Sequence, residues 1–421
     1  MTTHRHHTAR WVTRSRALLI GQIGPVATIS LAQLFGTSLW FSANSAAGDL
    51  MHAWHANAAD IGWLTSAVQA GFIVGALGIS ISGLADRFRA SSIFVCCAIL
   101  GALFNAGFAW FANDVASGMA FRFLVGVCLA GVYPVGMKLI VSWAPERTGP
   151  ALAQLVAMLT LGTALPHALK VAGADLPWQW VIDASSVLAL VGALMIYVLR
   201  DGPHLRVESR PAAGLPASTE KPPHVLDAFR NRGFRGAALG YFGHMWELYA
   251  FWTMVPLFVS GASLATAIHA GGVAGLSFCI IAVGAPACWF GGRLSRRFGS
   301  AKVAAGALAM SGACGLIFAL GWRHLPPVAL FVLLIAWGAS VIADSPQFSA
   351  LSAQACPREL VGSALAIQNS IGFAVTVVSI SAMTHLYGHI GLDAAWLLLP
   401  GPILGLIGFA PVLRRSAVMR R

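Results

Sequence analysis

The sequence predicts an all-α membrane protein, with twelve transmembrane helices arranged as two pseudo-symmetric six-helix bundles. Hydrophobic residues make up 57% of the 421 residues and charged residues only 10%, whereas a soluble domain carries about 25% charged residues. A soluble fold of this composition would expose large apolar patches, and a disordered chain needs far fewer hydrophobic residues. Because a helical span takes about 20 apolar residues, twelve spans with short loops fit the chain length.

Apolar stretches long enough to cross a bilayer follow one another along the chain. The expected spans are residues 18–44, 59–83, 91–112, 117–142, 149–171, 178–199, 235–259, 269–292, 301–322, 327–352, 360–385 and 394–413. The one long polar stretch, residues 200–234, contains several prolines and charges of both signs, which is typical of a flexible linker. We therefore expect an N-terminal bundle over residues 1–199 and a C-terminal bundle over residues 235–421, joined by a cytoplasmic linker.

The basic residues gather in loops that face one side of the membrane. The formal net charge is +12. With the N-terminus in the cytoplasm, nearly all of the 27 Lys and Arg residues fall in cytoplasmic segments, and Lys170 and Arg323 fall on the periplasmic side. This is the positive-inside pattern, so we expect an inner-membrane protein with both termini in the cytoplasm. The positive charge then contacts anionic lipid, and no nucleic-acid partner is expected.

The two halves contain matching segments at a nearly constant offset. The segments Gly83–Arg89 and Gly292–Gly299 follow the second and eighth spans, and Pro134 and Pro346 stand 212 positions apart. The matching pairs Leu84/Leu294, Arg87/Arg297 and Phe88/Phe298 are all 210 positions apart. A steady offset near half the chain length indicates a tandem duplication. Two parallel six-helix repeats place a binding cavity at their interface, near the bilayer midplane.

Two signature motifs accompany this organisation. The loop after span two contains Leu84-Ala85-Asp86-Arg87, with Arg89 following, and its second-half copy has Arg296 and Arg297 at the corresponding place. Span four contains Arg122 and Gly126 in the pattern R-x-x-x-G. Together with the twelve spans and the central linker, these motifs resemble the major facilitator superfamily over essentially the whole chain, although the loop departs from the family's G-x-L-A-D-R-x-G-R-[KR] by the equivalent of one deleted residue.

The resemblance implies roles for the charged residues of both motifs. Asp86, Arg87 and Arg89, with Arg296 and Arg297 in the second copy, would form a cytoplasmic latch that holds the outward-facing state, and Arg122 would take part in proton coupling. The alternative for the loop is plain anchoring, at about 1 kcal/mol per basic residue near the membrane surface. Asp86 favours the latch, because an acid adds nothing to anchoring. The alternative for Arg122 is snorkelling toward the periplasmic interface.

Glu247 and Asp344 are the acids that lie deepest in the predicted spans, where a charge costs several kcal/mol unless it is paired or hydrated. His244 precedes Glu247 by three residues and shares its helix face. A carboxyl beside an imidazole titrates as a coupled pair, as a proton relay requires. Pro346 breaks the helix just after Asp344, and a broken helix beside an acid lines a cavity in transporters. We therefore expect proton coupling through Glu247, His244, Asp344 and Arg122, with Glu247 near the interface of the halves; the alternative is a structural Glu–His hydrogen bond.

Polar and aromatic residues inside the spans predict the lining of the substrate cavity. They are Gln33, Thr37, Trp40, Gln69, Lys138, Trp246, Gln368 and Asn369. Each of them alone is also compatible with helix packing, and Lys138 lies close enough to the cytoplasmic end to snorkel. Trp40 and Trp246 fall at similar places in the two halves, and facing aromatic rings would suit an organic substrate.

The fixed charges point to the class of substrate. Arg122 and Lys138 make the first half positive, while Glu247 and Asp344 make the second half protonatable, which favours a small organic anion moving with protons. The chain has no phosphate-binding loop for ATP, no metal-site spacing among its seven cysteines and no catalytic histidine motif. We expect a monomeric secondary transporter that works by alternating access, with no cofactor and with protons as the coupling ion. The alternatives are proton-driven efflux of amphiphilic compounds and, more remotely, a membrane sensor or enzyme.

Overall fold

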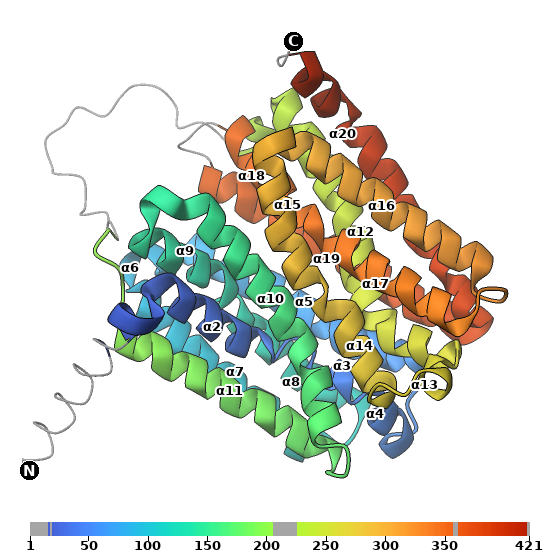
Figure 1. Ribbon diagram of the computed structural model, residues 1–421. Helices are drawn as coiled ribbons and strands as arrows, with labels where there is room; N and C mark the ends of the chain where they lie inside the picture. The colour runs from blue at the N-terminus through green and yellow to red at the C-terminus, as the bar shows by residue number, and fades with distance from the viewer. Residues whose placement is uncertain (1–15, 17–18, 205–224, 357–360, 419–421) are drawn as a thin grey trace, which may run out of the picture.

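The computed structural model describes residue 16 and residues 19–204, 225–356 and 361–418, and this part of the chain is helical without any strand. Figure 1 shows the helices of the N-terminal half, blue to green, beside those of the C-terminal half, yellow to red. Helix α11 (Trp178–Leu199) ends the first group and α12 (Arg232–Gly261) begins the second. The prediction of an all-α protein is confirmed.

All six spans predicted in the N-terminal half are helical. Span one is divided into α2 (Pro25–Thr37), α3 (Ser42–Ser45) and α4 (Ala47–Ala53), and is preceded by the π-helical turn η1 (Leu19–Ile23). The others are α5 (Ala58–Ser82), α7 (Ala90–Phe111), α8 (Val115–Leu129) with α9 (Tyr133–Trp143), α10 (Thr148–Ala172) and α11. The short pieces α6 (Leu84–Arg87) and η2 (Pro145–Arg147) lie in the connections.

The six spans predicted in the C-terminal half are helical as well. They are α12, α14 (Gly272–Ala282) with α15 (Gly284–Phe298), α16 (Ser300–Gly321), α17 (Pro327–Ala343) with α18 (Ser345–Ala355), α19 (Val361–Ile390) and α20 (Pro400–Val418). The connections contain η3 (Val225–Arg230), α13 (Leu264–Ala267) and η5 (Gly391–Leu398). Nine stretches of the described residues are long and apolar enough to cross a membrane, and one of them, Ala364–Arg415, includes both α19 and α20.

Spans four and ten are broken at matching places. Pro134 follows the break between α8 and α9, and Pro346 follows the break between α17 and α18. Proline lacks an N–H group and fits the first turn of a helix, so it favours a new helical segment at each place. Asp344 lies between Ala343 and Ser345, at the second break, so the predicted interruption beside this acid is confirmed.

Helices of the two halves meet along two seams. Helix α5 packs against α19, and α10 packs against α14 and α15. Within the N-terminal half, α5 also packs closely on α8. A Cβ atom at Gly126 would overlap the carbonyl oxygen of Val68, so these two helices approach each other backbone to backbone only because glycine stands there. The glycine of the R-x-x-x-G pattern therefore has a packing function.

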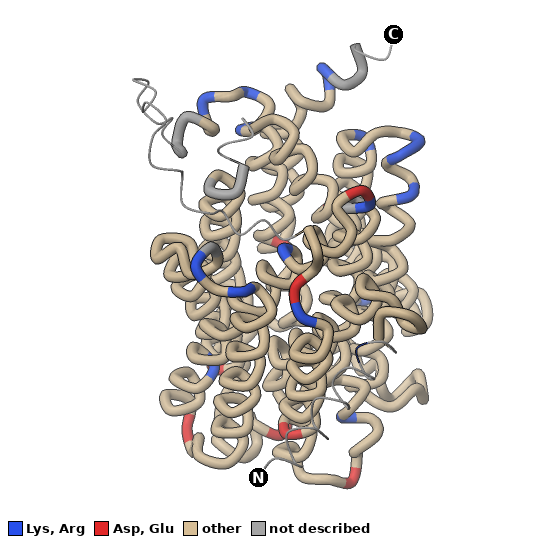
Figure 2. The backbone as a smooth tube through the Cα atoms, turned by 90° about the vertical axis from the view of Figure 1, so that its left-hand side faces the viewer, with Lys and Arg blue, Asp and Glu red and all other residues tan. Residues whose placement is uncertain are grey.

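The charged residues are divided between the two ends of the bundle. We call the end that contains α6 and the C-terminus of α11 the linker end, and the other the opposite end. Basic residues cluster around the linker end, and acidic residues are prominent at the opposite end (Figure 2). At the opposite end, the basic residues of the described chain are Lys170 and Arg323. This asymmetry follows the pattern that the sequence analysis predicts.

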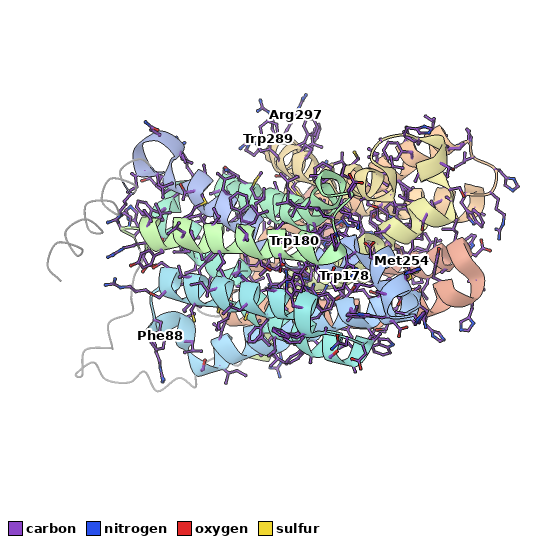
Figure 3. All side chains as sticks on the ribbon, turned by 90° about the horizontal axis from the view of Figure 1, so that it is seen from below. Phe88, Trp178, Trp180, Met254, Trp289 and Arg297 are labelled. Carbon is purple, nitrogen blue, oxygen red and sulfur yellow. The ribbon has the colours of Figure 1, made fainter. Side chains whose placement is uncertain are left out.

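The outward-facing side chains of the bundle are largely apolar. Trp180 on α11 is 53% exposed and Trp289 on α15 is 58% exposed, and both lie at the surface in Figure 3. Trp178, two residues before Trp180, instead points inward and packs edge-on against Trp54 and Phe108. Exposed aromatic residues of this kind suit a helix surface covered by lipid.

Candidate functional site

Arg122 is completely buried inside the N-terminal half, where span one is interrupted. Its Nη1 atom donates hydrogen bonds to the carbonyl of Leu39 (3.0 Å), to Ser42 Oγ (3.1 Å) and to Asn105 Oδ1 (3.0 Å). Its Nη2 atom donates to the carbonyl of Trp40. Residues 38–41 lie between α2 and α3 and have lost the regular helical ladder, so their carbonyls need donors from elsewhere. Arg122 supplies those donors.

The contacts of Arg122 also fix the direction of Trp40. The guanidinium holds the backbone of residues 39 and 40, and the Trp40 ring extends from that backbone to the seam between the halves, 5.7 Å from the Tyr249 ring of α12. Asn105 was absent from the sequence predictions. A polar residue in an otherwise apolar span was the only available signal for it. The predicted proton-coupling role of Arg122 stays a prediction, while the structure assigns it a positioning role.

Helix α12 has two faces with different partners. Tyr241, Met245, Tyr249 and Trp252 recur at three- or four-residue intervals and form one of them, where Tyr249 contacts rings of the N-terminal half. His244 and Glu247 belong to another face, which is turned to helices of the C-terminal half. The expectation that Glu247 lies near the interface of the halves is therefore wrong. Because α12 is buried on nearly every side, apolar periodicity gave no guide to its rotation.

Glu247 is 1% exposed and accepts a hydrogen bond at each carboxyl oxygen. Trp337 Nε1 on α17 donates to Oε1 at 2.6 Å, and Ser311 Oγ on α16 donates to Oε2 at 2.8 Å. The Trp337 ring lies 4.6 Å from that of Phe251, so this carboxyl is enclosed by aromatic rings. Sequence reasoning missed both donors, because a tryptophan or serine in an apolar span gives no sign of its partner.

His244 pairs with Asp344 rather than with Glu247. Nδ1 of His244 lies 2.8 Å from Oδ1 of Asp344, and the two side chains are 1% and 0% exposed. The distance suits an ion pair, although the ring is not turned to form a straight hydrogen bond. Asp344 lies at the break between α17 and α18. The expected pairing of His244 with Glu247 is therefore wrong, and the acid beside the imidazole is Asp344 on span ten.

The three ionisable side chains form one enclosed group within the C-terminal half. His244 and Glu247 are one turn apart on α12, and their partners Asp344 and Trp337 are two turns apart along span ten. With both carboxyls ionised and the imidazole neutral, the group has two negative charges. One proton on the imidazole gives a neutral ion pair beside one carboxylate, and a second proton leaves the group without net charge. A buried group of this kind changes its net charge, and hence the cost of being enclosed, when it binds or releases a proton.

Aromatic rings from the break in span one and from three helices meet at the seam between the halves. The Trp40 ring lies 5.0 Å from Phe72 on α5 and 5.8 Å from Phe373 on α19. Phe72 and Phe373 are 4.4 Å apart, and Tyr249 is 5.4 Å from Phe373. We call Trp40, Phe72, Tyr249 and Phe373 the central aromatic cluster. The sequence analysis identified Trp40 as a cavity residue but missed Phe72 and Phe373, because phenylalanine inside a span is ordinary packing material.

Several buried polar side chains have no hydrogen-bond partner among the described residues. They are the amides of Gln33, Gln69 and Gln368, the indole N–H groups of Trp40 and Trp252, and Nε2 of His167. Gln69 stands three residues from Ser66 and three from Phe72 along α5. The hydroxyl of Ser66 is hydrogen-bonded to that of Ser381 on α19, and Phe72 contacts Phe373 on the same helix. Asn369 is half-buried, one turn from Phe373. Since unpaired buried polar groups are costly, this set indicates polar binding capacity near the seam.

Three residues predicted for the cavity have other partners. Thr37 donates its hydroxyl to the carbonyl of Gln33 on its own helix, at 2.8 Å. Lys138 Nζ donates to the carbonyl of Ala85 in the loop after span two, at 2.5 Å. Trp246 Nε1 donates to the carbonyl of Leu397, at 2.8 Å, on the side of α12 that faces α20. The first two therefore stabilise backbone inside the N-terminal half, and Trp246 does not face Trp40.

The latch residues lie at the linker end. Arg87, Arg89, Arg296 and Arg297 are exposed there, with Arg297 stacked 5.3 Å from the Phe298 ring. The side chain of Asp86 is outside the described part of the structure. A latch between the two halves stays a prediction, although Lys138 holds the backbone of the same loop.

A cavity of about 600 Å³ opens between the halves at the opposite end. One wall comes from the ends of span one and α10, and the other comes from the end of α12 and the start of α14.

Solved structures with this fold are transporters. The xylose transporter XylE from E. coli, in a partially occluded inward open conformation, aligns with a TM-score of 0.69 over 91% of this chain and 97% of its own, at 14% identity. The nucleoside transporter NupG aligns with a TM-score of 0.67 over 92% of this chain and 99% of its own, at 15% identity. At these identities the likeness shows the fold alone.

Curated relatives match shorter segments. A niacin transporter from Acinetobacter baylyi is 37% identical over 99 residues, or 23% of this chain and 22% of its own length. A 3-(3-hydroxy-phenyl)propionate transporter from Escherichia coli is 32% identical over 154 residues, or 36% of this chain and 37% of its own. The profile of the Major Facilitator Superfamily matches residues 29–380. The chain therefore belongs to the Major Facilitator Superfamily, and its apolar helices are those of a multi-pass membrane protein.

Proposed function

We propose that this protein carries aromatic monocarboxylates across the inner membrane by alternating access, with coupling to protons. The observation that carries the proposal is the central aromatic cluster, together with the unpaired indole and amide groups around it. Aromatic faces bind a flat ring by stacking, and N–H groups without partners bind carboxylate oxygens. Niacin and 3-(3-hydroxy-phenyl)propionate, which name the substrates of the two relatives, are both aromatic carboxylic acids.

The enclosed group of Glu247, His244 and Asp344 supports proton coupling. It lies on the face of α12 that is turned to the other helices of the C-terminal half, while Tyr249 of the same helix belongs to the central aromatic cluster. A change in the charge of this group alters the packing of α12 against α16 and α17, and the same helix contacts the proposed substrate site. Proton binding and substrate binding then influence one another through one rigid element.

The charge asymmetry supports the orientation. The linker end carries the basic residues and would face the cytoplasm, with both termini on that side. The substrate path lies between the halves of a single chain, so we infer that one chain is sufficient for transport.

Uptake into proteoliposomes tests this function. We expect benzoate, nicotinate and 3-phenylpropionate to accumulate when a pH gradient is imposed, and a protonophore to abolish the accumulation. Xylose and uridine serve as controls of similar size that lack a carboxylate. Uptake of the controls at the same rate as the carboxylates would contradict the substrate class. Accumulation that does not depend on the pH gradient would contradict the coupling to protons. Expulsion of amphiphilic dyes, without carboxylate transport, would favour efflux instead.

A further inference from the structure

The cavity at the opposite end has one polar wall. Lys170 Nζ, near the end of α10, lies 2.8 Å from Asp49 Oδ2 on α4, and their side chains are 19% and 37% exposed. His167 stands three residues before Lys170 and therefore shares its helix face. This imidazole lines the cavity, is 1% exposed, and has no hydrogen-bond partner for Nε2 within the described chain. Asn44 completes the wall.

The other wall is apolar. It comes from the C-terminal half and includes Pro256 and Leu257 at the end of α12, and Val273 and Ala274 at the start of α14. The cavity therefore has a cationic and hydrogen-bonding side facing a hydrocarbon side. Its volume of about 600 Å³ falls within the range of small-molecule sites, roughly 300–1,000 Å³.

We propose that this cavity is a receiving site for organic monocarboxylates, separate from the central aromatic cluster. The carboxylate takes the place of Asp49 beside Lys170 and accepts a hydrogen bond from His167, while the ring lies against Pro256 and Leu257. Asp49 is the more exposed partner of the ion pair, so it remains hydrated when released. The inference deepens the proposed function, on which it rests, because it concerns the same class of substrate before that substrate reaches the seam.

Removal of Asp49 and removal of Lys170 should have opposite effects on ligand binding. Asp49 competes with the incoming carboxylate for one ammonium group, so its removal should strengthen ligand binding, whereas removal of Lys170 should weaken it. A purely structural ion pair would give the same direction of change in both variants, since either substitution breaks it. The two variants therefore separate binding from stability.

Calorimetric titration of the purified full-length protein with benzoate tests the inference. We expect two sites in the unmodified protein. In Lys170→Gln and in His167→Gln, one site should weaken by about tenfold or more, the size of a charge-assisted contact, while the other is unchanged. Asp49→Asn should tighten that same site several-fold. Benzamide, which has the same ring without the charge, should bind at this site in none of the proteins.

The outcomes distinguish the two proposals. A single benzoate site that is indifferent to Lys170→Gln and Asp49→Asn would overturn the receiving site and leave the proposed function standing. Equal weakening by Asp49→Asn and Lys170→Gln would also overturn it, as would tight binding of benzamide there. Absence of both benzoate binding and benzoate uptake in the unmodified protein would overturn the proposed function, and the receiving site with it.

Discussion

At the scale of single residues, Arg122 is a buried cation whose four hydrogen-bond partners are all neutral. Without it, three buried acceptors, namely the carbonyls of Leu39 and Trp40 and Oδ1 of Asn105, share one remaining donor, the hydroxyl of Ser42. Each buried acceptor without a partner costs about 1–3 kcal/mol. The side chain is therefore a structural requirement of the broken first span, whatever else it does during transport.

Arg122→Met should lower the unfolding free energy by on the order of 2–4 kcal/mol, from at least two unpaired acceptors. Arg122→Lys should recover part of this, because the ammonium reaches fewer of the partners. Thermal unfolding in detergent measures both. Stability equal to that of the unmodified protein in Arg122→Met would refute the positioning role. A stable Arg122→Lys protein that exchanges substrate but fails to accumulate it would instead support the proton-coupling role.

Glu247→Gln should spare folding and substrate exchange and abolish accumulation driven by a proton gradient. Glutamine still accepts from Trp337, and Ser311 can reverse its hydroxyl, so the shape is kept while the proton site is lost. Ser311→Ala is the matched control, since it removes one hydrogen bond worth about 1 kcal/mol and leaves the carboxyl in place. Counterflow and gradient-driven uptake are compared in proteoliposomes. Full gradient-driven uptake by Glu247→Gln would remove Glu247 from the mechanism and leave Asp344 as the buried acid to test.

At the scale of elements, the contact between α5 and α8 depends on glycine. Gly126→Ala should separate the two helices and lower the melting temperature, because its Cβ would overlap the Val68 carbonyl. Gly78→Ala on α5 is the matched control, since its Cβ would meet no heavy atom within 4 Å, and alanine is favoured over glycine in a helix by about 1 kcal/mol. We expect opposite signs for the two substitutions. Similar melting temperatures for both would show that the helices adjust freely.

A second inter-element contact lies at the opposite end. Arg323 donates to both carboxyl oxygens of Asp393, at 2.8 and 2.5 Å, and Trp322 Nε1 donates to Oδ1 at 2.9 Å. The hydrogen bonds from Arg323 and then from Trp322 hold the pKa of Asp393 below its usual value of 3.8. The lowered pKa means that the stabilisation is complete above about pH 4 and is lost as the pH falls through the folded-state pKa.

Asp393→Asn should therefore lower the melting temperature slightly at neutral pH, where the ion pair is intact. The difference from the unmodified protein should shrink as the pH is lowered below about 4, because protonation of Asp393 abolishes the same interaction. Differential scanning fluorimetry across this range measures the convergence. A difference that stays constant into acid would mean that the pair does not act through its charge.

At the scale of the whole molecule, length and hydropathy were enough to predict the helices but not their rotations. All twelve predicted spans are helical, because a membrane leaves few alternatives for the backbone. The partners of Glu247 and His244 could not be predicted, since a helix that is buried all round has no polar face to indicate its orientation. For the same reason Trp246 was expected to face Trp40, whereas its indole is turned to the α20 side of α12. The break at Asp344 was predictable because proline acts locally.

The orientation of the whole molecule is open to a direct test. A thiol tag placed in residues 206–222 should react with a membrane-impermeant maleimide only when cells are opened, as the positive-inside pattern requires. The matched control is a tag at the opposite end, at Ser263, which should react in intact cells. Labelling of the linker from outside intact cells would reverse the orientation and the side assigned to the latch.

The neutral partners of Arg122 have a consequence for biogenesis. Leu39, Trp40, Ser42 and Asn105 all precede Arg122 in the chain, so every acceptor is synthesised before α8 leaves the ribosome. An arginine at the centre of a span costs about 2.5–3.5 kcal/mol on insertion scales, and Arg122, in the first third of its span, costs less. Partners that are already inserted offset that cost as the helix enters. Glu247 is in the reverse position, because its hydrogen-bond donors Ser311 and Trp337 are both made after it. The N-terminal half can therefore supply hydrogen bonds to its buried cation in order of synthesis, whereas α12 must wait for α16 and α17 before its carboxyl is enclosed.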